Sequence, residues 1–152
     1  MQTSLKYFSL LAFLLILLVG CRDVEEEVIK KHPLDNSLCN FNQGECNQIV
    51  ADLTVSLSIT PEHAPSELPL NVKLNFSQDV ENVKFLVEGR DMFMGIIPGS
   101  LHQVSDSKTQ YEGELIYGSC SSNYMVWRMF VSFDYQQQSQ TVLFDFLADN
   151  QS

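Results

Sequence analysis

The feature that most constrains this chain is an alternation of apolar and polar residues along several short segments. The longest run covers residues 125–135, where every odd position carries Met, Trp, Val, Phe or Tyr. Residues 51–59 repeat the pattern, with apolar side chains at each odd position and polar ones between them. Because successive side chains of a strand point to opposite faces, this period of two predicts strands with one buried face.

Seven such strands are expected after residue 38. They cover residues 51–59, 70–76, 83–87, 92–97, 111–117, 125–135 and 141–148. Prolines and glycines separate them, and no segment in this part of the sequence has the 3.6-residue period of a helix. Short strands at this spacing favour a single all-β domain, an Ig-like antiparallel sandwich, with a small barrel as the alternative.

The first twenty residues have the pattern of a secretory signal. Lys6 precedes the apolar run 7–19, which is shorter than the roughly 20 residues that cross a bilayer as a helix. The sequence Leu-Val-Gly-Cys at 18–21 resembles the bacterial lipobox, which implies that Cys21 is lipidated after the leader is cut. The expected parts are a lipoprotein signal peptide at 1–20, lipidated Cys21 with a flexible tether at 21–38, and the sandwich domain at 39–149.

The residue after Cys21 indicates where the protein acts, and the net charge excludes one class of partner. By resemblance to enterobacterial sorting signals, Arg22 favours the outer membrane, with the domain facing the periplasm. The chain has 9 basic and 19 acidic residues, a formal net charge of −10, and so has no electrostatic basis for binding nucleic acid. The expected partners are the membrane, through the lipid anchor, and an envelope protein or metal-receiving protein.

Three cysteines remain once Cys21 is assigned to lipid, and an oxidising compartment favours pairing between two of them. Cys39 and Cys46 flank the turn-forming sequence Asn-Gln-Gly, which favours a local Cys39–Cys46 disulfide. A Cys46–Cys120 disulfide is the alternative, and it would close a longer loop. In either case one thiol is left over, to bind a metal, to pair with a partner or to be buried without a role.

Four methionines cluster in two short segments. Met92 and Met94 lie in the sequence Asp-Met-Phe-Met-Gly, and Met125 and Met129 flank Trp127. Two thioethers at alternate positions of a strand share a face, and soft sulfur ligands select Cu(I). The competing interpretation is that the methionines, with the tryptophan, fill the core. The candidate Cu(I) ligands are therefore Met92 and Met94, with Met125, Cys120 or His102 as a third.

Three motifs together carry a family resemblance. They are Gly-x-Asp-Met-x-Met-Gly at 89–95, Tyr-x-Gly at 111–113 and Cys-x4-Met-x-Trp at 120–127. This arrangement resembles a family of small, uncharacterised bacterial periplasmic lipoproteins, similar in layout to FixH/YtkA-like domains. The resemblance implies an Ig-like fold and proximity to copper delivery. The chain departs from dedicated copper carriers because no histidine adjoins Met92 or Met94.

No catalytic motif stands out in the sequence. It contains no Walker phosphate loop, Gly-x-Ser-x-Gly or His-Glu-x-x-His, and neither His32 nor His63 forms a recognisable dyad. We therefore expect a non-enzymatic, lipid-anchored binding module that handles Cu(I) in the envelope. The alternative is a metal-free interaction or assembly protein of the outer membrane, which an exposed apolar patch or strand edge would favour.

Overall fold

The computed structural model describes residues 35–104, 106–120 and 124–150. The predicted signal peptide, the lipidation site Cys21 and the tether up to residue 34 lie outside these residues. No helix in the described part of the chain is long and apolar enough to cross a membrane. The strands given below belong to one compact unit that begins at Asp35, so a chain that starts at residue 22 keeps every contact described here.

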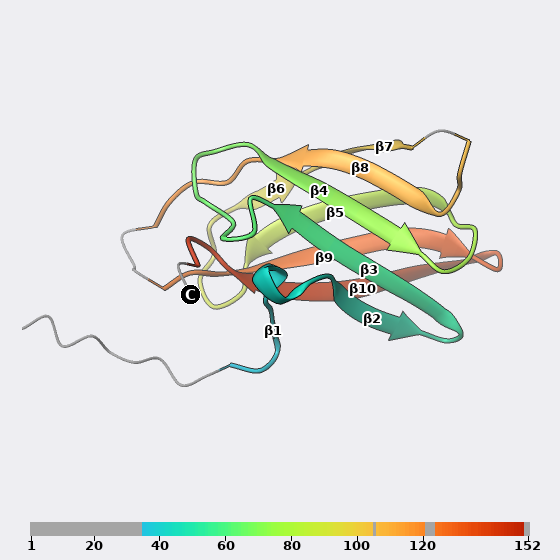
Figure 1. Ribbon diagram of the computed structural model, residues 1–152, viewed down its shortest axis with the longest axis horizontal. Helices are drawn as coiled ribbons and strands as arrows, with labels where there is room; N and C mark the ends of the chain where they lie inside the picture. Colours follow the sequence, from blue (N-terminus) through green and yellow to red (C-terminus); the bar gives the residue numbers. More distant parts are fainter. Residues whose placement is uncertain (1–34, 105, 121–123, 151–152) are drawn as a thin grey trace, which may run out of the picture. The chain divides into compact units, whose positions relative to one another are not determined.

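The described residues form two five-stranded sheets that pack face to face (Figure 1). The first sheet has the strand order β1-β10-β9-β5-β6, and the second has β2-β3-β4-β8-β7. The strands are β1 (Leu38–Cys39), β2 (Cys46–Val50), β3 (Leu53–Thr60), β4 (Leu70–Phe76), β5 (Glu81–Gly89), β6 (Ile96–Pro98), β7 (Ser100–Gln103), β8 (Gln110–Leu115), β9 (Val126–Tyr135) and β10 (Gln138–Leu147). A short 3-10 turn, η1 (Phe41–Gln43), connects β1 to β2. The predicted sandwich is therefore confirmed.

Alternation explains which side chains fill the space between the sheets. Along β9 the odd positions from Trp127 to Tyr135 are buried, while Arg128 and Phe130 on the other face remain partly exposed. The sheets meet through aromatic pairs such as Phe76 and Phe133, whose ring centroids lie 5.1 Å apart. Burial of these apolar surfaces, at about 25 cal/mol per Å², is the main force that holds the two sheets together.

The structure contains more strands than the sequence predicted, and the additional ones lie at sheet edges. The prediction of seven strands omitted β1, β2 and β7, and it extended the strand at 92–97 too far toward the N-terminus. Only Ile96–Pro98 form β6, so Met92 and Met94 lie in the preceding loop rather than on a strand. An edge strand sends fewer side chains into the core, so its sequence alternates less clearly.

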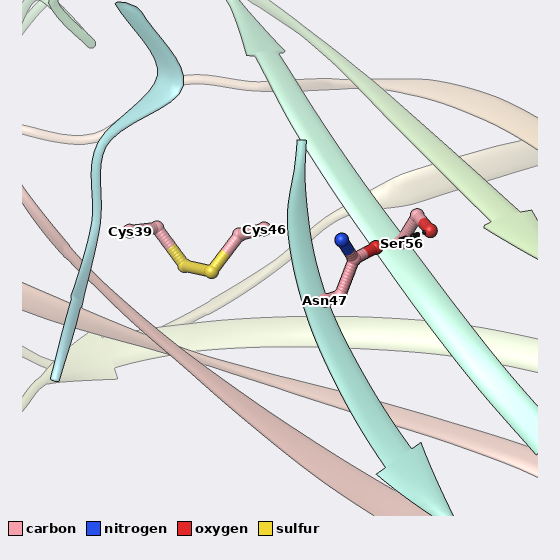
Figure 2. Close-up of a disulfide and its surroundings, with 4 residues drawn as sticks. All are labelled: Cys39, Cys46, Asn47 and Ser56. Carbon is pink, nitrogen blue, oxygen red and sulfur yellow. Dashed lines mark hydrogen bonds between the residues drawn. A yellow bond between two sulfur atoms is a disulfide. The ribbon is translucent and has the colours of Figure 1, made fainter. Parts of the chain in front are cut away.

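Strands that change from one sheet to the other close both long sides of the sandwich. On one side β1 of the first sheet leads into β2 of the second, and on the other side β6 leads into β7. The Cys39–Cys46 disulfide joins β1 to β2 (Figure 2), so the first predicted pairing is confirmed and the Cys46–Cys120 alternative is wrong. Figure 2 also shows the Ser56 hydroxyl of β3 donating a hydrogen bond to Asn47 of β2.

Candidate functional site

Three connecting segments meet at one end of the sandwich, on the left in Figure 1. Main-chain hydrogen bonds hold them together. The amide of Glu67 donates to the carbonyl of Tyr117 at 2.8 Å, and the amide of Arg90 donates to the carbonyl of Val126 at 2.9 Å. The segments are the β4-preceding loop at 61–69, the β5–β6 loop at 90–95, and residues 116–120 and 124–125 from the β8–β9 connection.

A pair of sulfur atoms lies at this end. The Cys120 thiol sulfur and the Met92 thioether sulfur are 4.0 Å apart, although the two residues are separated by 28 positions in the sequence. Cys120 is a free, partly exposed cysteine, and the Met92 side chain is 50% exposed. The structure therefore brings together one thiol and one thioether that solvent can reach.

Gly89 lets the main chain of Met92 and the side chain of Met125 both lie close to the end of β5. A Cβ atom at Gly89 would lie 2.1 Å from the carbonyl oxygen of Met92 and 2.6 Å from the terminal methyl of Met125. Only a glycine leaves room for both contacts at once. Met125 itself is 6% exposed, whereas Met92 is half exposed and Cys120 is partly buried against the core.

An ionic network holds the β5–β6 loop in place. The Arg90 guanidinium contacts Asp35 at 2.8 Å, Asp91 at 3.1 Å and Asp145 at 3.4 Å. Asp145 also accepts a hydrogen bond from Arg128 at 2.7 Å. Since Arg90 stands two residues before Met92, this network fixes the start of the loop that carries the exposed thioether.

The charges of this network shift the pKa of its members. Hydrogen bonds from Ser37, followed by the ion pair with Arg90, lower the pKa of the Asp35 carboxyl to about 2. Hydrogen bonds to Asp91 and then to Asp35 raise the pKa of the Arg90 guanidinium, which stays charged at all relevant pH values. Asp35 and Arg90 are therefore both charged at neutral pH.

Met94 and His102, the remaining predicted ligands, are placed differently. Met94 is partly buried and packs against the core. His102 lies on β7 opposite Glu112 of β8, on the outward face of the second sheet. Because side chains alternate across a strand, His102 points away from the core. The structure therefore pairs Met92 with Cys120 and buries Met125 near Gly89, while His102 lies on the outward face of the second sheet.

The interpretation of Met125, Trp127 and Met129 as core residues is confirmed, since all three are buried. The Trp127 ring packs on Tyr117 with centroids 4.8 Å apart. The Trp127 indole N–H is buried and has no hydrogen-bond partner among the described residues. Trp127 is thus part of the core between the two sheets.

The described residues contain no cluster of three or more His, Cys, Asp or Glu side chains with metal-binding geometry. A metal held at the sulfur pair would therefore be bound mainly by thioether and thiolate sulfur. Sequence reasoning found the sulfur residues but missed Gly89 and Arg90, which position them. The adjacent charges of Arg90 and Asp91 beside Met92 were the one signal for the ionic network.

A second concavity lies at the opposite end of the sandwich. It has a volume of about 500 Å³, and its lining is polar, with Asp79, Glu81, Lys108 and Asp134 among the residues around it. The ammonium group of Lys108 pairs with the Glu81 carboxylate, so the one cation in the lining is already neutralised. No sulfur or imidazole group is present in this lining, so it offers no ligand for a soft metal.

Comparison with known proteins identifies the fold alone. No protein-family profile matches the sequence, and no curated protein matches it. The structure is similar to a DUF4426 family protein from Pseudomonas aeruginosa PAO1, with a TM-score of 0.50 and 16% identity over 69% of this chain and 94% of that one. A DUF4785 family protein from Legionella pneumophila has a TM-score of 0.47 and 13% identity, over 64% of this chain and 28% of that one. The first match shows that bacterial domain proteins share this sandwich.

Proposed function

We propose that this protein is a lipid-anchored binding module of the bacterial cell envelope that handles Cu(I). Its ligands are the Met92 thioether and the Cys120 thiolate, with the Met125 thioether as the third. The observation that carries the proposal is the 4.0 Å separation of the Met92 and Cys120 sulfurs at an accessible end of the domain.

The donor set matches the chemistry of Cu(I). Thiolate and thioether sulfurs are soft ligands, and soft ligands select Cu(I) over the harder divalent metals. Two metal–sulfur bonds of about 2.3 Å that meet at about 120° hold their sulfurs about 4.0 Å apart. The observed distance thus suits a three-coordinate site, and metal binding would displace the Cys120 thiol proton.

Exposure suits a protein that receives and releases its metal. Met92 is half exposed, and the neighbouring Phe93 is 79% exposed, so a second protein can reach the site directly. Met125 is buried near Gly89, at the end of the strand that leads to Met92. A metal-receiving envelope protein is accordingly the partner that we propose.

The test is an anaerobic titration of Cu(I), against a competing chelator, into a chain that starts at residue 22. We expect one tightly bound ion per chain. Met92→Leu and Cys120→Ser should each weaken binding about a hundredfold, or about 2.7 kcal/mol. Met129→Leu is the control, because Met129 is a fully buried methionine of β9 that lies outside the proposed site. Equal binding by wild type and the Met92→Leu/Cys120→Ser variant would contradict the proposal.

Lipid anchoring at Cys21 is tested separately. Labelling with a fatty acid should mark the full chain, and Cys21→Ala should abolish the label because no other residue can be diacylated. Fractionation of the membranes should then place the labelled protein in the outer membrane. Recovery of the label in the inner membrane would contradict the sorting that Arg22 predicts.

The alternative function, a metal-free interaction or assembly protein, has one observation in its favour. The outward face of the first sheet carries apolar side chains, including Ile96 at 59% exposure and Leu143 at 41%. A protein with this face and no Cu(I) affinity would act through contacts with other proteins.

A further inference from the structure

The outward faces of the two sheets differ in composition. On β3, β4 and β8 of the second sheet the outward positions are polar, and they include Thr54, Ser56, Ser58, Asn71, Lys73, Asn75, Glu112 and Glu114. At the edge of the second sheet β2 adds one exposed apolar residue, Ile49, whereas the first sheet carries a continuous row of apolar residues among the polar ones on its outward face. Since both faces belong to one domain in one solvent, the difference indicates that the first face contacts something other than water.

The apolar residues form a row that crosses four strands. Leu143 on β10 is opposite Phe130 on β9, Phe130 is opposite Leu86 on β5, and Leu86 is opposite Pro98 on β6. All four lie on the outward side of their strands, and none is fully buried. We call these four residues the apolar row.

Two opposite charges flank the row at equal distances. Lys84 and Glu88 stand two residues before and two residues after Leu86, on the same face of β5. Neither forms an ion pair with another described residue. A rotation by 180° about the row exchanges their positions, so the charges of β5 are complementary to those of β5 in a rotated copy.

We propose that the outward face of the first sheet binds a second copy of this chain in a symmetric dimer. The two-fold axis runs along the apolar row. Leu86 then packs on Leu86 of the second copy, and Lys84 of each chain faces Glu88 of the other. Face-to-face sheets pack about 10 Å apart, which is close enough for both contacts.

The size of the face is sufficient for a weak dimer. β9 and β10 are ten residues long, or about 34 Å, and four strands are about 19 Å wide. Because β6 has only three residues, the resulting face covers about 500 Å², which is below the roughly 800 Å² per partner of a standard interface. With a single apolar row at its centre, it predicts a dissociation constant in the micromolar range.

Self-complementarity favours a second copy over an unrelated partner. An unrelated protein would require a matching surface of its own, and nothing would then place Lys84 and Glu88 symmetrically about Leu86. In the dimer the two-fold symmetry creates the Lys84–Glu88 pair twice. The pairing of unlike charges also sets the antiparallel orientation of the two sheets.

The experiment is sedimentation equilibrium on a chain that starts at residue 22 and carries Cys120→Ser, which removes the free thiol as a source of covalent dimers. With no substitution in the proposed interface, this chain should form a dimer whose fraction rises with protein concentration. Lys84→Glu and Glu88→Lys should each weaken it about tenfold, because each turns two attractions into two repulsions. The double variant Lys84→Glu/Glu88→Lys should return to within about twofold of the starting affinity.

Lys73→Glu, on the outward face of the second sheet, is the matched control and should leave the dimer unchanged. Thermal unfolding of each variant shows whether the domain still folds. A monomer at all concentrations up to about 1 mM would overturn the proposal. A dimer that the double charge exchange fails to restore would overturn it as well. None of these surface charges belongs to the sulfur site, so the result is independent of the proposed Cu(I) function.

Discussion

Removal of the Cys39–Cys46 disulfide is expected to lower the free energy of unfolding by about 2.5 kcal/mol. The two cysteines are separated by seven positions. For a loop of this length, the chain-entropy relation gives about 8 cal/mol/K of entropy that the disulfide removes from the unfolded chain, or about 2.5 kcal/mol at 25 °C. This is a large share of the 5–15 kcal/mol that typically stabilises a domain.

The position of the disulfide explains why its loss should not be compensated elsewhere. β1 has only two residues, and Leu38 and Cys39 pair with β10 in parallel. The disulfide ties this short strand of the first sheet to β2 at the edge of the second. Alanine is the suitable replacement at both positions, because Cys39 is buried and a serine there would bury a hydroxyl.

The assay is urea unfolding of Cys39→Ala/Cys46→Ala beside the wild type. We expect a midpoint shift equivalent to about 2.5 kcal/mol and a melting temperature lower by about 10 °C. Wild type under reducing conditions should match the variant, and Cys120→Ala should show neither change. If the free energy of unfolding of the double variant lies within about 0.5 kcal/mol of the wild-type value, the disulfide does not stabilise the fold by constraining the unfolded chain, and the prediction is refuted.

Two further predictions concern the loop that carries the sulfur site. Gly89→Ala should destabilise the domain by about 1–3 kcal/mol and weaken Cu(I) binding, because its Cβ would lie 2.1 Å from the Met92 carbonyl. Gly118→Ala is the control for both thermal unfolding and the Cu(I) titration, since a Cβ atom added at Gly118 would have no atom within 4 Å. The Asp35 carboxyl, with its pKa lowered to about 2 from 3.8, should contribute its full stabilisation above pH 4 and lose it as the pH falls toward 2. In an NMR titration, Arg90→Gln should raise the Asp35 pKa toward its ordinary value.

The central strands were predictable because one face of each packs into the core, and this imposes a regular alternation of apolar and polar residues. The prediction for residues 70–76 coincides with β4, and 125–135 differs from β9 by one residue. β2 escaped prediction because it lies at a sheet edge. Its outward residue Ile49 is exposed and apolar, which breaks the alternation that a buried face imposes.

The site was predictable in its residue types but not in its geometry. The expected strand at 92–97 does not extend over the methionines because Gly95 has a φ of 84°, in the left-handed region that strands do not use. The contact between Met92 and Cys120 joins two connections that neither local propensity nor spacing relates. It depends on how the ends of β5, β8 and β9 are brought to one end of the sandwich, which is a property of the whole fold.

The proposed dimer and the proposed metal site make one joint prediction. β5 carries Leu86 at the centre of the apolar row and ends at Gly89, beside the sulfur pair. An axis along the row reverses the direction of every strand, so the two sulfur sites lie at opposite ends of the dimer and both remain open to solvent. Each chain should then bind Cu(I) independently, with a Hill coefficient of about 1 above and below the dissociation constant of the dimer. Cooperative binding that persists in Lys84→Glu would show that the two copies meet through the sulfur ends instead.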